Sequence, residues 1–134
     1  MSLVVLDTDV ASAILRGRLP DRLRARLTGK TSCITLITLG ELTTWTVIRS
    51  WAPRKLAELA HWRAGVSVLP FDEQVATTWG LLQANAQLRG RSRPVNDTWI
   101  AASCLVERLP LATFNTKDFL DFAEHHGLRL FDVS

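Results

Sequence analysis

Short apolar runs alternate with helical segments along the whole chain. No other feature of the sequence restricts the possible folds as much as this alternation. Residues 3–6 form a continuous apolar run that ends at Asp7, as expected of a parallel strand buried on both faces. Further strands are predicted at 31–36, 66–69 and 111–114, with an edge strand at 128–131. Strands and helices that alternate in this way predict an α/β sandwich with a mostly parallel sheet of four to five strands.

The segments between the predicted strands carry apolar residues at helical spacing. Asp72 is expected to cap the longest helix, which Gly90 ends. The other helices are predicted at 10–16, 21–27, 37–50, 53–65 and 96–108, with a short one opening near Lys117. In open α/β sheets ligands bind beyond the carboxyl ends of the strands, so a functional site is expected at that edge.

Length and composition indicate one domain spanning residues 1–134. The chain is 47% hydrophobic and 22% charged, with a net charge of +3 and a pI near 9.4, a balance compatible with a phosphate-rich partner. No apolar run is long enough to cross a membrane and no leader peptide is recognisable, which predicts a cytoplasmic protein. Cys33 and Cys104 have apolar neighbours and no metal-binding spacing, so both are expected to be buried free thiols.

Four acids from separate segments are expected at the carboxyl edge of the sheet. Asp7 ends the first strand, Asp97 opens a helix and Asp118 follows the last strand, while Glu41 lies on the helix after the second strand. Carboxylates clustered in a half-buried pocket repel one another unless they share protons or bind a divalent cation. Oxygen ligands on a rigid frame suit Mg²⁺ or Mn²⁺, and these ions promote phosphodiester chemistry.

Each acid also has a purely structural interpretation. Asp7 and Asp9 are both candidates for a helix N-cap, and Asp9 suits a cap better than a ligand; Asn96 or Asp97 could cap the later helix. Glu41 is the strongest single indication of a site, because its helix is otherwise nearly uncharged and an unpaired charge there would be costly. Thr8 and Thr113, beside the acids, are candidates for hydroxyls that orient a carboxylate or a water.

Four motifs in the chain, at 5–10, 40–42, 96–102 and 113–119, together resemble the PIN-domain toxins called VapC. The resemblance implies a PIN-like three-layer sandwich and a Mg²⁺- or Mn²⁺-dependent endoribonuclease, with tRNA or ribosomal RNA as substrates. It also implies a homodimer that is inhibited by a small VapB-type antitoxin. Asp7, Glu41 and Asp97 match the metal-binding acids of the family.

The fourth acid of the family pattern has no clear counterpart, because this chain has Asn115 and then Asp118 in the last motif. Either Asn115 holds a water on the metal, or Asp118 substitutes, or only one ion binds tightly. Arg91, Arg93 and Lys117 flank the acids and are candidates for contacts with RNA phosphates.

Three of the five Trp residues fall on the adjacent helices predicted at 37–50 and 53–65 or between them. Trp45 and Trp51 are predicted to line a groove for an antitoxin helix, with Trp62 near them, although at least one of the three is expected to pack in the core. Trp79 and Trp99 are expected in the core.

Three other functions fit parts of the sequence. A haloacid-dehalogenase-like phosphatase would use Asp7 and Asp9, but its later acidic motif is absent and Glu41 and Asp97 would have no role. A non-enzymatic receiver-like module would use Asp72 as the phosphoacceptor. An inactive PIN fold serving as an interaction protein would not be expected to keep the three central acids.

Overall fold

The computed structural model describes residues 2–134, which form four strands and seven helices. All strand pairs are parallel, in the order β3-β2-β1-β4. In chain order the elements are β1 (Ser2–Leu6), α1 (Thr8–Leu15), α2 (Asp21–Leu27), β2 (Lys30–Thr35), α3 (Leu36–Ile48), α4 (Pro53–Ala64), β3 (Ser67–Leu69), α5 (Glu73–Leu88), α6 (Val95–Glu107), β4 (Leu111–Ala112) and α7 (Thr116–His126). The predicted α/β fold with a parallel sheet is confirmed.

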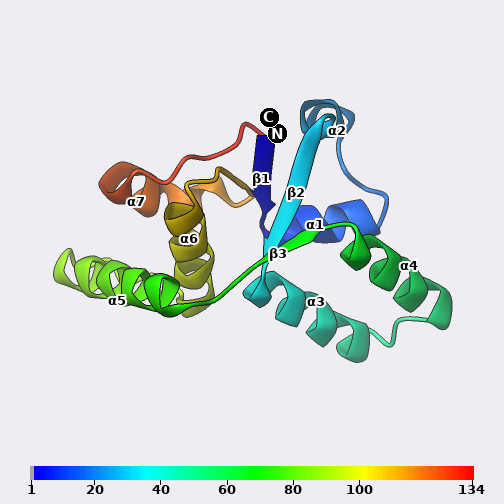
Figure 1. The fold of residues 1–134 in the computed structure, drawn as a ribbon, viewed down its shortest axis with the longest axis horizontal. Helices are drawn as coiled ribbons and strands as arrows, with labels where there is room; N and C mark the ends of the chain where they lie inside the picture. Colours follow the sequence, from blue (N-terminus) through cyan, green and yellow to red (C-terminus); the bar gives the residue numbers. More distant parts are fainter. Residues whose placement is uncertain (1) are drawn as a thin grey trace.

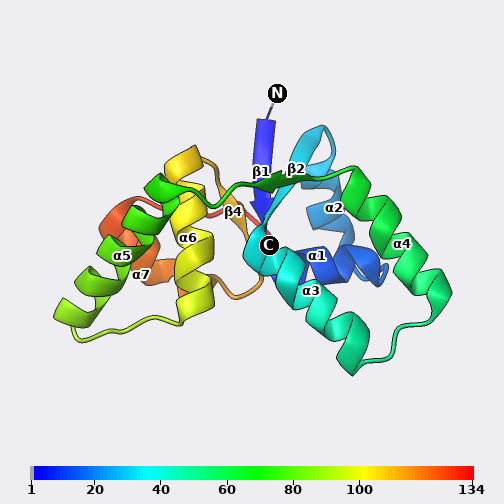
Figure 2. The ribbon, with the colours of Figure 1, turned by 60° about the horizontal axis from the view of Figure 1, so that its bottom comes forward.

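Helices cover both faces of this sheet. Figures 1 and 2 show α5, α6 and α7 on one side of it and α1 to α4 on the other. Val5 and Cys33 belong to the core under α5–α7, whereas Val4, Leu6 and Ile34 belong to the core under α1–α4. This alternation follows from the period of two along a strand, and it gives the expected three-layer sandwich.

The chain leaves three strands at the same edge of the sheet, where β1 leads into α1, β2 into α3 and β4 toward α7. The first turns of these helices therefore lie around one crevice, as is usual in parallel sheets. The remaining segment at this crevice is the start of α6, which follows the loop over residues 89–94.

The prediction of the last strands was partly wrong. β4 covers only Leu111 and Ala112 instead of 111–114, and the Phe114 N–H donates to the Asp9 carboxylate in the first turn of α1 instead of to a neighbouring strand. The edge strand expected at 128–131 is also wrong, since that segment forms a single bridge between Leu130 and Leu111.

Two helix starts also differ from the prediction. Asp7 caps α1, so Asp9 is not a cap and lies in the first turn. Pro94 occupies the N-cap position of α6, which places both Asn96 and Asp97 in the first turn. Asp72 caps α5 as expected, through a 3.0 Å bond from the Val75 N–H.

Several smaller predictions agree with the structure. Cys33 and Cys104 are buried free thiols. Trp79 and Trp99 stack on each other at 4.9 Å between ring centroids and pack against the core under α5–α7. Within residues 2–134, the longest apolar helices fall short of what crossing a membrane requires.

We predict that Phe122→Ala, in the middle of α7, destabilises the fold by about 3–5 kcal/mol, because truncation of a core aromatic leaves a cavity. Phe122 has no exposed surface and its ring lies 6.0 Å from that of Phe119. Leu88→Ala is the control, since Leu88 is 84% exposed and its loss should cost less than about 0.5 kcal/mol. Equal urea midpoints for the two variants would contradict this account of the core.

Candidate active site

Asp7 is the most deeply buried carboxylate of the crevice, with 7% of its surface exposed. Its Oδ1 accepts a hydrogen bond from the Thr8 N–H at 2.8 Å, and its Oδ2 accepts one from the Thr113 hydroxyl at 2.8 Å. The first bond caps α1 and the second joins the end of β1 to the end of β4. Both oxygens of Asp7 are therefore held in place by the elements that form the edge of the sheet.

Glu41 reaches the same crevice from the second turn of α3. Its Oε1 accepts a hydrogen bond from the Thr8 hydroxyl at 2.7 Å, and the Thr8 and Thr38 hydroxyl oxygens lie 3.0 Å apart. Thr8 thus contacts Asp7 through its backbone and Glu41 through its side chain. The two hydroxyls predicted to orient acids, Thr8 and Thr113, thus donate to Glu41 and Asp7.

Asp97 lies in the first turn of α6, half-buried beside a cation and further acids. The Arg93 guanidinium donates to the backbone carbonyl of Asp118 at 3.3 Å, which ties the loop before α6 to the first turn of α7. The charges of Asp118 and Glu41 disfavour ionisation of Asp97, and the charge of Arg93 favours it. Asp118, Glu41 and Arg93 are therefore close enough to Asp97 to influence its pKa.

Asp9 bonds to the loop between β4 and α7 and does not cap α1, contrary to its interpretation as a helix cap. Its Oδ2 accepts hydrogen bonds from the Phe114 N–H and from the Asn115 side-chain amide, both at 3.1 Å. The Asn115 backbone N–H in turn donates to the Thr113 hydroxyl at 3.0 Å. Sequence reasoning missed this role, although a second acid two residues after Asp7 was the available signal.

Asp7, Asp9 and Asp97 have pKa values above the ordinary range of a carboxyl group. Burial, and next the negative charge of Asp9, raise the pKa of Asp7 to about 6, with a smaller contribution from Asp97. Burial is also the main cause of the raised pKa of Asp97 and of Asp9. A divalent cation would relieve both the desolvation and the repulsion that produce these shifts.

The donor set fits a hard divalent cation. Carboxylates are the ligands that Mg²⁺ and Mn²⁺ prefer, and Asp9 Oδ1 is buried with no hydrogen-bond partner. Asp7, Glu41 and Asp97 are the residues predicted from the sequence to hold such an ion. Among residues 2–134, no three His, Cys, Asp or Glu side chains stand close enough together to ligate one ion in the present arrangement.

The predicted basic residues lie on two segments beside the acids. Arg91 and Lys117 are exposed, and Arg93 is half-buried against α7. Trp45 packs on the core under α1–α4 with the Arg49 guanidinium over its ring, and Trp51 lies between α3 and α4 with the Lys55 ammonium over its ring. The tryptophans thus lie on α3 and the turn that follows it, with Trp45 one helical turn after Glu41 and Trp51 beyond the end of α3.

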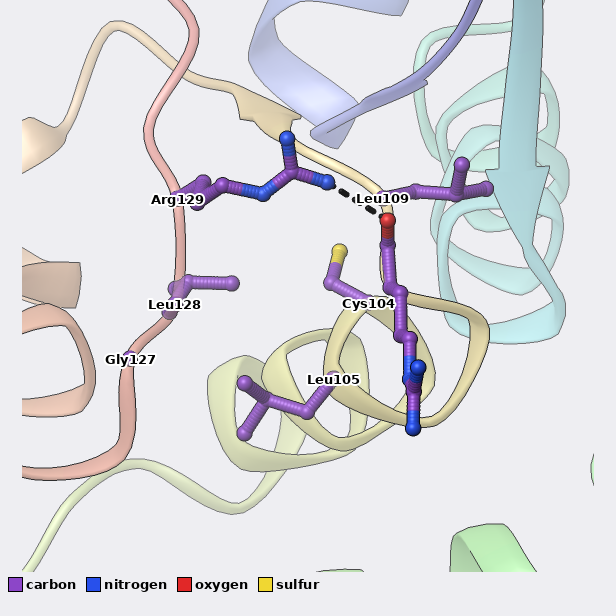
Figure 3. Close-up of a pocket in the computed structure, with 7 residues that line it drawn as sticks. Cys104, Leu105, Leu109, Gly127, Leu128 and Arg129 are labelled. Carbon is purple, nitrogen blue, oxygen red and sulfur yellow. Dashed lines mark hydrogen bonds between the residues drawn. The ribbon is translucent and has the colours of Figure 1, made fainter.

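The cavity shown in Figure 3 takes no part in this site. It has a volume of about 320 Å³ and lies at the C-terminal end of α6, whereas Asp97 is at the start of that helix. The Arg129 guanidinium closes one side of it through a 2.6 Å bond to the Arg108 carbonyl. Its lining residues are Cys104, Leu105, Arg108, Leu109, Gly127, Leu128 and Arg129, with no carboxylate among them.

The fold and the cluster of acids define the class of protein. The PIN domain profile matches residues 4–125, and the chain therefore belongs to the PIN domain family. The curated relative that the chain matches is a VapC ribonuclease. Ribonuclease VapC5 of Mycobacterium tuberculosis is 31% identical over 117 residues, which cover 81% of this chain and 80% of that protein.

Solved structures of toxin–antitoxin complexes share the fold. DNA-bound VapBC from Salmonella typhimurium contains a chain 28% identical to this one, with a TM-score of 0.82 and complete coverage of both chains. VapBC-5 from Mycobacterium tuberculosis is 29% identical, with a TM-score of 0.72, and the match covers 99% of this chain and 100% of that one. The predicted resemblance to VapC toxins is confirmed.

The phosphatase and receiver-like alternatives do not agree with these findings. The family match excludes both, and Asp72, the proposed phosphoacceptor, is occupied as the N-cap of α5. The structure also gives Glu41 and Asp97 a place in the crevice, which neither alternative explains.

We predict that Asp7→Asn stabilises the metal-free protein at pH 7.5 by on the order of 2–3 kcal/mol. The folded pKa of Asp7 is raised to about 6, above the ordinary 3.8, so the fold binds more protons than the unfolded chain between these values. Its stability therefore falls as pH rises through this window, and Asn removes the effect. Urea denaturation in EDTA from pH 4 to 8 measures the difference between the two proteins.

The exposed Asp21, in the first turn of α2, provides the matched control Asp21→Asn, which should change stability little at any pH in this range. An Asp7→Asn effect of the same size at pH 4 and pH 8 would contradict the assigned cause.

Proposed function

We propose that this chain is a divalent-metal-dependent endoribonuclease toxin that cleaves structured RNA by attack of water on a phosphodiester. The observation that carries the proposal is the placement of acids at the carboxyl edge of the sheet, where Asp7 after β1 is buried and Glu41 on α3 and Asp97 on α6 are half-buried. The relative from Mycobacterium tuberculosis named as a ribonuclease supports RNA as the substrate class.

The chain's own residues would position the ion and the phosphate. Thr113 and the Thr8 N–H fix both oxygens of Asp7, and the Thr8 hydroxyl fixes Glu41, so two of the acids are held before an ion binds. When bound, Mg²⁺ or Mn²⁺ would activate water for attack at phosphorus and neutralise the charge that builds up there. The hydrolysis would break one P–O bond of the RNA backbone.

Basic residues beside the crevice would bind the RNA backbone. Arg91 and Lys117 are exposed on the two segments that precede Asp97 and Asp118, and Arg93, in the loop before α6, donates to the Asp118 carbonyl. Such contacts neutralise phosphates and make binding depend on salt without reading sequence. Recognition of a particular RNA loop would come from its shape and its unstacked bases.

We predict that Asp97→Asn lowers RNA cleavage in Mn²⁺ by at least about a hundredfold, because it removes a charged ligand from the site. Far-UV circular dichroism should be unchanged, since the Asp97 side chain does not cap α6. Cleavage of a panel of structured RNAs, with Mn²⁺ or EDTA, measures the loss, with Asp21→Asn as the matched control. A variant that cuts RNA at the wild-type rate would refute the proposed site.

We propose that this toxin forms a homodimer. We also propose that its inhibitory partner is a VapB-type antitoxin. The solved relatives are VapBC toxin–antitoxin complexes, which supports a protein inhibitor for this chain. An apolar surface around Trp51 suits a partner helix, because Val47 and Ile48 are 75% and 73% exposed and Leu56 adds a further apolar side chain. A basic side chain of the partner placed in the crevice would neutralise the charges that the metal otherwise neutralises.

We predict that Trp51→Ala weakens antitoxin binding at least tenfold while RNA cleavage by the free toxin is largely retained. Trp51 is in the turn between α3 and α4, remote from the first turns of α1, α6 and α7 that carry the acids. Excess Mn²⁺ should partly relieve inhibition of the wild-type toxin. Undiminished affinity of both Trp45→Ala and Trp51→Ala for the neighbouring gene's product, measured by calorimetry, would place the groove elsewhere.

A further inference from the structure

Asp121, on α7, is a buried carboxylate outside the crevice, and its side chain is only 6% exposed. It accepts a charge-assisted hydrogen bond from the guanidinium of Arg89, the C-cap residue of α5. The Arg89 guanidinium also lies 3.4 Å from His126 Nε2, and His125 Nε2 lies 3.7 Å from the Asp121 carboxylate. A largely buried ion pair thus joins the C-terminal end of α5 to α7.

Stability alone explains this ion pair poorly. Removing two charges from water costs free energy, which a buried pair recovers only when its remaining polar atoms also find partners. In the described part of the chain, Asp121 Oδ1 and Arg89 Nε are buried without a hydrogen-bond partner. Phe119 and Phe122 already anchor α7 in the core. The pair is therefore better understood through the geometry that it fixes.

The backbone of Arg91 is tied to the end of α5. Its N–H donates to the Ala86 carbonyl at 2.8 Å, and the Gly90 N–H donates to the Gln87 carbonyl at 2.9 Å. Gly90 has a φ of 72°, the left-handed conformation that is common just after a helix. The Arg91 side chain is exposed. The end of α5 therefore sets the point from which this side chain extends.

α7 holds both ends of the basic loop, which comprises residues 89–94. Arg89 bonds to Asp121 at the start of the loop, and the Arg93 guanidinium donates to the Asp118 carbonyl at 3.3 Å near its end. Positions 118 and 121 are three residues apart, so they lie on the same face of α7. The exposed Arg91 is therefore between two anchored arginines.

We propose that Asp121 is a positioning residue for RNA binding, which holds the basic loop through Arg89 so that Arg91 is presented to RNA phosphates beside the crevice. The inference rests on the proposed function, in which Arg91 contacts the RNA backbone. A loop that is already fixed loses less conformational freedom when RNA binds, so its affinity is higher. Asp121 does not contact the RNA, because its carboxylate is buried and bonded to Arg89.

The first test is the binding of a panel of fluorescently labelled hairpin RNAs to the full-length protein, measured by anisotropy in EDTA. Asp121→Asn removes a negative charge, so electrostatic attraction alone would tighten RNA binding. We expect the opposite, a loss of affinity of about fivefold or more, because the loop is no longer held. Unchanged or tighter binding would overturn the role of Asp121. The matched control is Asp132→Asn, which removes an acid from the more exposed ion pair with Arg26 and should not weaken binding.

A double-mutant cycle with Arg91→Gln separates positioning from a general loss of structure. If Asp121 acts by presenting Arg91, the variant Arg91→Gln/Asp121→Asn should bind the hairpin RNAs as weakly as Arg91→Gln alone does. Losses of affinity that add in full would show that Asp121 acts on another part of the fold, and would overturn the proposal.

Limited proteolysis with trypsin tests the loop without RNA. Trypsin cleaves the bond after Arg91, whereas the bond between Arg93 and Pro94 resists it. We expect the fragment that ends at Arg91 to form about fivefold faster or more in Asp121→Asn than in the wild type, with Asp132→Asn unchanged. Equal rates in Asp121→Asn and the wild type would contradict the anchoring of the loop.

Arg89→Lys is the second variant, for the case in which Asp121→Asn does not fold. A lysine keeps the positive charge but lacks the planar fork of the guanidinium that reaches both Asp121 and His126. Weaker RNA binding and faster cleavage after Arg91 are expected again. Wild-type behaviour of Arg89→Lys in both measurements would then overturn the proposal.

The outcomes distinguish this inference from the proposed function. RNA binding that is weakened by Arg91→Gln but not by Asp121→Asn would overturn the role of Asp121 and leave the proposed function in place. Failure of the wild type to bind any of the RNAs would overturn the proposed function and this inference with it.

Discussion

The buried Asp7 carboxylate at the end of β1 is the constraint on which the rest of the site depends. Its oxygens are removed from water and lie near the negative charge of Asp9, so the charged form is disfavoured and the pKa rises to about 6. A fold gains nothing in stability from this arrangement. The cost is understandable if a cation completes the site, because the same burial that disfavours the free carboxylate strengthens its attraction to a divalent ion.

The hydrogen bonds that hold Asp7 also shape the local fold. The Thr113 hydroxyl and the Phe114 N–H turn toward α1, which ends β4 after two residues and directs the chain into α7. Thr8 links Asp7 to Glu41, because its N–H donates to Asp7 and its hydroxyl donates to Glu41. The end of the sheet and the geometry of the acids are therefore one structural feature, made by short hydroxyl side chains at strand ends.

The parallel sheet, the order of helices and the placement of Asp7 at the carboxyl edge of the sheet were predictable, because hydrophobic periodicity identifies buried strands and parallel strands bring their carboxyl ends to one edge. The hydrogen bonds of Asp9 to the loop between β4 and α7 were not predictable from the sequence. A first-turn acid has the same sequence pattern whether it caps a helix or bonds to a distant loop, and only the three-dimensional contact with Asn115 distinguishes them. The short β4 was missed for the same reason, since Thr113 and Phe114 suit a strand by composition.

The proton count on Mn²⁺ binding tests the central claim most directly. Calorimetric titration at pH 6 in buffers of different ionisation enthalpy gives the number of protons released per ion. If buried carboxylates with raised pKa values bind the metal, about half a proton or more should be released at pH 6 and far less at pH 8, with tighter binding at the higher pH. Mn²⁺ binding with no proton release at pH 6 and the same affinity at both pH values would contradict the claim.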